Sequence, residues 1–76
     1  FMAPQAFAQT VCEDNLSGTS DGAVANGAGD LACGENAFAD GGYATAVGVD
    51  TVATGTSSVA IGDSAEATGA QGVAIG

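Results

Sequence analysis

A repeat of seven residues runs without a gap from Gly22 to Gly76 and constrains the fold more than any other feature. Its units are GAVANGA, GDLACGE, NAFADGG, YATAVGV, DTVATGT, SSVAIGD, SAEATGA and QGVAIG. The fourth position is always alanine: Ala25, Ala32, Ala39, Ala46, Ala53, Ala60, Ala67 and Ala74. The sixth is always glycine, which costs about 1 kcal/mol in a helix relative to alanine and so excludes a coiled coil. The surrounding Val, Ile, Thr and Ser residues favour strands instead.

The fifth position separates two kinds of unit that alternate along the chain. One kind has Cys33, Val47, Ile61 and Ile75 there, and the other has Asn26, Asp40, Thr54 and Thr68. The structural repeat is therefore two units, which form one fourteen-residue coil made of two strands. We expect strands of about four or five residues, each followed by a turn marked by glycine. Like strands stack about 4.8 Å apart, so the pattern predicts an all-β solenoid with two parallel sheets face to face.

The alternation of side chains along a strand indicates what lies inside each coil. Alanine at the fourth position occurs in both kinds of unit, and the space between the two sheets is the one place that both share. We therefore expect all eight alanines inside the roll, together with small residues at the second position such as Ala37, Ala44 and Ser58. The alternative, with Val and Ile inside and alanine outside, leaves the shared alanine unexplained.

With alanine inside, the third and fifth positions face outward, and the two sheets differ there. One face carries Asn26, Asp40, Thr54, Glu66 and Thr68. The other carries an apolar stripe of Leu31, Cys33, Val47, Val59, Ile61, Val73 and Ile75. Such a stripe indicates an interface, because full burial of each side chain stabilises by about 1.5–3 kcal/mol. A symmetric homo-oligomer with the stripe on its axis would bury it, and the periodicity is consistent with a dimer or a trimer.

The charge balance excludes several kinds of partner. The chain has nine Asp and Glu residues and no Lys, Arg or His. It therefore cannot neutralise phosphate groups, so nucleic acids and anionic membrane surfaces are poor partners. No run of about 18 apolar residues offers a membrane span. A chain of 76 residues with 13 glycines also needs a disulfide, a metal or partner subunits to be stable.

The strings TAVG, SSVAIG and GVAIG, spaced by two units and interleaved with ATG, resemble the YadA-like head repeats of trimeric autotransporter adhesins. The resemblance covers residues 22–76 and is looser in the first two units, whose VANG and LACG suit a capping coil. It implies a left-handed parallel β-roll, assembled as a homotrimer on the outer membrane of a Gram-negative bacterium. It also implies adhesion to host or environmental surfaces, with extracellular matrix proteins such as collagen among the ligands, and hence a role in virulence. The stalk and membrane anchor of the family have no counterpart in this sequence.

Two cysteines, Cys12 and Cys33, are present. In an exported protein an even count suggests a disulfide, and a bond between these two would fasten the N-terminal segment to the open end of the solenoid. Free thiols or bonds between chains remain alternatives, because Cys33 lies in the apolar stripe.

Residues 1–21 lie outside the repeat, and we expect them to form an irregular leader or cap. Ala6-Phe7-Ala8 has the small-x-small form of a signal-peptidase site, so residues 1–8 are either the remnant of an export signal or a leader that packs on the first repeat. Phe38 and Tyr43 are the aromatic candidates for a ligand contact, with packing against neighbouring chains as the alternative.

The sequence indicates no enzyme and no cofactor, because it offers no His, Lys or Arg to activate a nucleophile. Five aspartates lie near turns but not in matching positions of successive coils, so we expect no metal site: Asp21, Asp30, Asp40, Asp50 and Asp63. An ice-binding solenoid needs a longer threonine array than Thr54 and Thr68. Three functions remain: an adhesive head, a structural spacer in a surface fibre, and a small ion- or ligand-binding solenoid.

Overall fold

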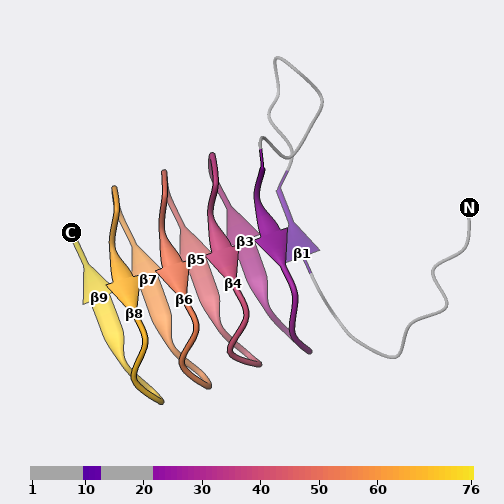
Figure 1. The fold of residues 1–76 in the computed structure, drawn as a ribbon, viewed down its shortest axis with the longest axis vertical. Helices are drawn as coiled ribbons and strands as arrows, with labels where there is room; N and C mark the ends of the chain where they lie inside the picture. Colours follow the sequence, from indigo (N-terminus) through magenta and orange to yellow (C-terminus); the bar gives the residue numbers. More distant parts are fainter. Residues whose placement is uncertain (1–9, 13–21) are drawn as a thin grey trace, which may run out of the picture.

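Nine short strands form the part of the chain that this computed structural model describes, residues 10–12 and 22–76 (Figure 1). They are β1 (Thr10–Val11), β2 (Val24–Ala25), β3 (Leu31–Cys33), β4 (Phe38–Ala39), β5 (Thr45–Val47), β6 (Val52–Ala53), β7 (Val59–Ile61), β8 (Glu66–Ala67) and β9 (Val73–Ile75). Each coil of the roll contributes one strand to each of two sheets, and successive coils lie side by side along the molecule.

The two sheets are parallel, and their register follows the repeat. The five-stranded sheet has the order β1-β3-β5-β7-β9, and the four-stranded sheet has the order β2-β4-β6-β8. Ala32 pairs with Ala46 and Ala46 with Ala60, so equivalent positions stack directly on one another. The prediction of a β-solenoid whose coils each comprise two units of the repeat is therefore confirmed.

The strands are shorter than the four or five residues expected, because the corners take more of each unit. Every strand has two or three residues. The first residue of every unit adopts a left-handed conformation, including Tyr43 at φ 60° and Asp50 at φ 56°. Six of these eight residues are not glycine. The sharp reversal at each corner is therefore made by the first position and is not reserved for glycine.

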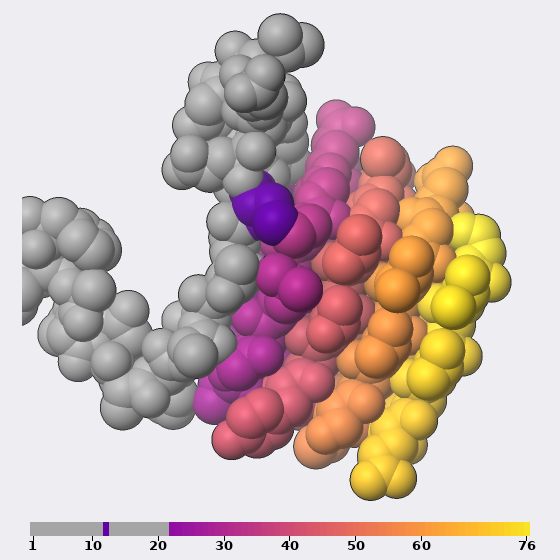
Figure 2. Space-filling view, turned by 180° about the vertical axis from the view of Figure 1, so that it is seen from behind, coloured from indigo at the N-terminus to yellow at the C-terminus, as the bar shows by residue number. Residues whose placement is uncertain are grey.

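The glycine at the sixth position has a different role, which is close stacking between coils. A Cβ atom at Gly48 would run into the carbonyl oxygen of Gly62 in the next coil, and one at Gly55 would run into that of Gly69. At Gly48 the backbone also has φ 127°, which a larger side chain rarely adopts. The glycine columns thus let neighbouring coils touch along their backbones, and Figure 2 shows the coils as adjacent, closely packed ridges.

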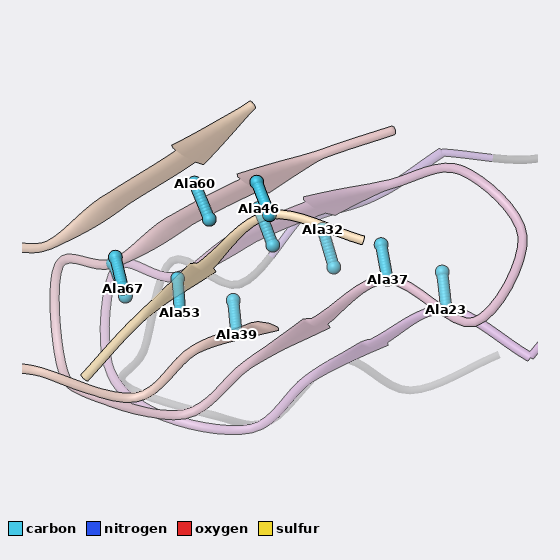
Figure 3. Packing of buried hydrophobic residues seen from close by; sticks show 10 residues of the cluster. Ala23, Ala32, Ala37, Ala39, Ala46, Ala53, Ala60 and Ala67 are labelled. Carbon is cyan, nitrogen blue, oxygen red and sulfur yellow. The ribbon is translucent and has the colours of Figure 1, made fainter. Parts of the chain in front are cut away.

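Alanine fills the space between the sheets. Ala32, Ala39, Ala46, Ala53 and Ala60 are fully buried, and the side chains from the two sheets point toward one another (Figure 3). Ala67 is also buried, while Ala25 and Ala74, in the first and last coils, are partly buried against the same cluster. Alanine methyl groups therefore fill most of the space between the sheets, which lets the two sheets approach closely.

The segment before the repeat contributes a strand that was not predicted from the sequence. Thr10–Val11 forms β1 and pairs with β3, with Thr10 opposite Leu31 and Val11 opposite Ala32. The amide of Cys12 donates to the carbonyl oxygen of Ala32 at 3.0 Å. Residues 10–12 therefore extend the five-stranded sheet beyond the first coil of the repeat. The proposed signal remnant at residues 1–8 lies outside the described residues.

Candidate functional surfaces

The apolar stripe lies on the outer face of the five-stranded sheet, in two columns. The third-position column runs through Leu31, Thr45, Val59 and Val73, and the fifth-position column through Cys33, Val47, Ile61 and Ile75. Leu31, Val47 and Val59 are half-buried by their neighbours in the stack. Exposure is 38% at Ile61, and it reaches 68% at Val73 and 73% at Ile75 because β9 has a neighbouring strand on one side only. Thr45 is the single polar residue within these columns. The stripe is therefore a continuous apolar surface on one side of the chain.

The outer face of the four-stranded sheet is mixed in character. Its third-position column joins Val24, Phe38, Val52 and Glu66. The fifth position carries Asn26, Asp40, Thr54 and Thr68, which are all exposed. The amide of Asn26 donates to Asp40 Oδ1 at 3.1 Å, which links two successive coils. This face thus combines apolar and acidic groups.

A similar amide–carboxylate pair links coils at the corner that follows the five-stranded sheet. There Asn36 Nδ2 donates to Asp50 Oδ1 at 3.1 Å. Both pairs join residues that are 14 apart, and an Asn followed by an Asp one coil later was visible in the sequence. From the sequence, Asp50 was expected only near a turn and Asp40 near a turn and on the polar face, and neither hydrogen-bonded pair was predicted.

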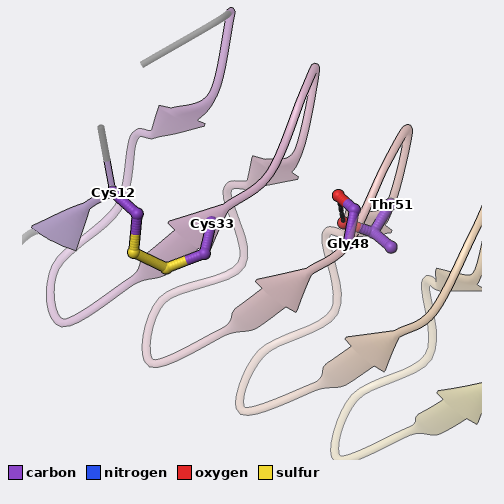
Figure 4. The surroundings of a disulfide bond; sticks show 4 residues. All are labelled: Cys12, Cys33, Gly48 and Thr51. Carbon is purple, nitrogen blue, oxygen red and sulfur yellow. Dashed lines mark hydrogen bonds between the residues drawn. A yellow bond between two sulfur atoms is a disulfide. The ribbon is translucent and has the colours of Figure 1, made fainter. Parts of the chain in front are cut away.

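Cys12 and Cys33 are joined by a disulfide bond, with their Cα atoms 4.7 Å apart (Figure 4). Cys12 follows β1 directly and Cys33 ends β3, so the bond links two neighbouring strands of the five-stranded sheet. The disulfide stands at the head of the fifth-position column of the apolar stripe. It fastens β1 to the first coil of the repeat.

The two aromatic candidates lie in different places. Phe38 is half-buried on the outer face of β4. Tyr43 is 70% exposed at the corner before β5. Its ring covers the backbone one coil earlier, since a Cβ atom at Gly29 would lie 2.6 Å from Tyr43 Cδ1. The structure therefore assigns Phe38 to the sheet face and Tyr43 to a corner.

Asp30 is a buried carboxylate rather than an ordinary turn residue, which corrects the expectation from the sequence. It is 1% exposed and occupies the second, inward-facing position of its unit. Its Oδ2 accepts from the amide of Gly27 at 2.7 Å, and its Oδ1 accepts from the amide of Ala44 at 2.8 Å. These contacts hold the first corner of the roll together and leave the side chain no access to an external ligand.

Two further polar side chains are buried at the second position. Thr51 Oγ1 donates to the carbonyl oxygen of Gly48 at 3.2 Å (Figure 4). The hydroxyl of Ser58 has no hydrogen-bond partner among the described residues. Both side chains are fully buried and therefore belong to the interior of the roll, not to a binding site.

In residues 10–12 and 22–76, no three His, Cys, Asp or Glu side chains come together as a metal site would require. No helix long and apolar enough to cross a membrane occurs in the same residues. The functional candidates on the described residues are therefore the two sheet faces and the corners between them.

The YadA head domain repeat matches the chain in two copies, over residues 25–51 and 53–76. Each copy spans about two coils, and together the copies cover more than half of the chain. No curated protein and no solved structure matches the chain significantly.

Proposed function

Since the chain belongs to the family of YadA head domain repeats, we propose that it forms part of an adhesive head that binds host or environmental surfaces. The family consists of head domains of trimeric autotransporter adhesins, which are surface-exposed proteins of Gram-negative bacteria, and it is not an enzyme family. The proposal extends this to a homotrimer anchored at the outer membrane, with matrix proteins such as collagen as ligands and a role in virulence.

The observation that carries the proposal is the apolar stripe on the five-stranded sheet. Within the stack Ile61 is 38% exposed, and in the last strand, β9, which is covered on one side only, Val73 and Ile75 are 68% and 73% exposed. Three copies that turn their stripes toward a common axis would bury these side chains, each worth about 1.5–3 kcal/mol on full burial. The four-stranded sheet and the corners would then form the outer surface of the head.

Replacing Val59→Asp together with Ile61→Asp tests the assembly. These residues lie at the third and fifth positions of β7, and two carboxylates from each copy would meet at the axis without any basic group nearby. We expect light scattering to give a trimeric mass for the wild-type chain and a monomeric mass for the double variant.

The matched control is Val24→Asp with Thr68→Asp, at the same two positions of units on the four-stranded sheet, where neither new carboxylate stacks on an existing one. This variant should keep the trimeric mass. A monodisperse wild-type monomer, or a trimeric Val59→Asp/Ile61→Asp variant, would contradict the proposed assembly.

Adhesion is tested separately, by binding of the wild-type chain to immobilised matrix proteins such as collagen, with the unassembled Val59→Asp/Ile61→Asp variant alongside. Saturable binding that is lost in this variant would support an adhesive head. A stable trimer without binding to any such surface would instead indicate a structural spacer in a surface fibre.

A further inference from the structure

The exposed acidic side chains of residues 22–76 are confined to one half of the roll surface. Glu35, Asp50 and Asp63 lie at the corner that follows the five-stranded sheet, and Asp40 and Glu66 lie on the outer face of the four-stranded sheet. In the described repeat, the outer face of the five-stranded sheet and the opposite corner carry no exposed carboxylate. The chain has no basic side chain to offset this asymmetry.

No two of these carboxylates stack directly on one another in the coils. On the four-stranded sheet, Asp40 lies between Asn26 and Thr54 in the fifth-position column. At the corner, Asp50 follows Asn36, which donates to it at 3.1 Å. Like charges opposite one another would destabilise neighbouring strands, and a neutral residue next to each acid in its column avoids this. The acids are therefore compatible with a stable roll while giving one face a net negative potential.

An apolar column runs through the same face. Val24, Phe38 and Val52 stack in register along β2, β4 and β6. Val24 is 41% exposed, and Phe38 and Val52 keep part of their surface accessible. Asp40 lies two residues after Phe38, on the same side of β4, and Glu66 continues the apolar column at β8. Apolar contact area and negative charge thus lie next to one another on this face.

We propose that the outer face of the four-stranded sheet is a docking surface for a basic polypeptide segment that also carries apolar side chains. Lys or Arg side chains pair with Asp40 and Glu66, and the apolar side chains cover Phe38 and Val52. The corner acids Glu35, Asp50 and Asp63 attract the segment over the Debye length of about 8–10 Å without contacting it. The inference rests on the proposed function, because an axial five-stranded sheet leaves the four-stranded sheet facing outward.

Charge complementarity selects this class of partner over others. Nucleic acids, sulfated polymers and anionic lipid surfaces would be repelled by the same carboxylates. The described residues provide no group of three ligands for a divalent cation. A neutral apolar partner would leave the acids desolvated and unpaired, which is costly.

Two synthetic peptides of equal length and equal lysine content test the proposal, one alternating Lys with Leu and the other alternating Lys with Ser. Fluorescence anisotropy of each labelled peptide with the full 76-residue chain gives the affinity, at about 50 and about 200 mM salt. We expect the Lys-Leu peptide to bind roughly tenfold more tightly than the Lys-Ser peptide, because it also buries the apolar column. Equal binding of the two peptides would overturn the proposal.

Asp40→Asn combined with Glu66→Gln should weaken Lys-Leu binding roughly tenfold, since two charge pairs are lost. The new amide at position 40 still accepts from Asn26, so the roll is preserved. Phe38→Ala should weaken the Lys-Leu peptide and leave the Lys-Ser peptide unchanged. Circular dichroism of each variant establishes that it is folded.

The control variant is Glu35→Gln with Asp63→Asn, which removes the same net charge from the corner. Its Lys-Leu affinity should stay within about twofold of the wild type, because distant exposed charges contribute chiefly to the association rate. Equal weakening by the corner and face variants would show a response to net charge alone and would refute a docking surface. Light scattering of the wild-type chain tests the proposed trimer independently of the docking surface. If the chain is a monomer and still binds the Lys-Leu peptide more tightly than the Lys-Ser peptide, the trimer is refuted and the docking surface is supported.

Discussion

The buried carboxylate of Asp30 offers a sharp test of how the first corner of the roll is held. Asp30→Ala removes the acceptors of two backbone amides, those of Gly27 and Ala44. The Ala44 amide is buried, so leaving it unpaired costs about 1–3 kcal/mol. The Gly27 amide is only partly buried, so water recovers some of its loss. We expect a total destabilisation of about 2–4 kcal/mol.

The free energy of unfolding of Asp30→Asn should lie between those of the wild type and Asp30→Ala. The amide oxygen can still accept one of the two bonds, but the amide nitrogen is a donor and cannot accept the other. A loss of about 1–2 kcal/mol follows, which is a large share of the roughly 4–11 kcal/mol typical of a domain of this length. Urea unfolding followed by circular dichroism measures the series, at one fixed chain concentration because assembly also contributes to stability.

Ser58→Ala is the matched control, because Ser58 is fully buried at the second position two coils later in the same sheet. Its hydroxyl has no partner among the described residues, so its removal should leave stability unchanged or raise it slightly. If Asp30→Ala unfolds within about 0.5 kcal/mol of the wild type, the two hydrogen bonds do not stabilise this corner and the argument is wrong.

Two further predictions concern the disulfide and the glycine columns. Cys12 and Cys33 are 21 residues apart, and reduction of their disulfide should lower the free energy of unfolding by about 3 kcal/mol and so lower the urea midpoint. A Cys12→Ser/Cys33→Ser variant should not respond to reductant. An unchanged midpoint on reduction of the wild type would count against the chain-entropy argument. Gly48→Ala should abolish the folded circular dichroism signal, because its Cβ atom would collide with the backbone of Gly62 in the next coil. Gly42→Ala is the control: the space around its Cβ atom is open and only its φ of 81° is strained, so it should lower the free energy of unfolding by about 1–2 kcal/mol. A folded Gly48→Ala variant would contradict the backbone contact between coils.

The sequence predicted the parts of the fold that depend on periodicity, and it missed those that depend on backbone geometry. The alanines and the alternation between Ile61 and Thr68 were enough to give the two sheets and the two-unit coil. The left-handed first position carries residues as different as Tyr43 and Gln71, so no residue type marked it. Glycine was correctly assigned to the turn, where Gly34, Gly48 and Gly62 lie with positive φ, but its backbone contact with the next coil was not predicted.

The missed features of the candidate surfaces have similar causes. β1 is only two residues long and lies outside the repeat, so no periodic pattern in the sequence predicted it. Asp30 was classed with the turn aspartates because its unit is one of the two irregular ones, and only the fold shows that its position points inward. The apolar stripe was visible in advance, because its residues recur in the same column of every second unit.

The direct stacking of equivalent residues also limits how such a chain can change length. Inserting or deleting two units adds or removes one complete coil and keeps every column in line. A change of one unit would still match alanine to alanine and glycine to glycine, so the interior would be satisfied. Downstream of it, however, the strand that carries Ile61 would exchange sheets with the strand that carries Thr68. The apolar side chains would then cross to the opposite wall, and in the proposed trimer the coils on either side of the change could no longer share one axis. Within the stack, insertions of an odd number of units would therefore be opposed by the outer surface and not by the core.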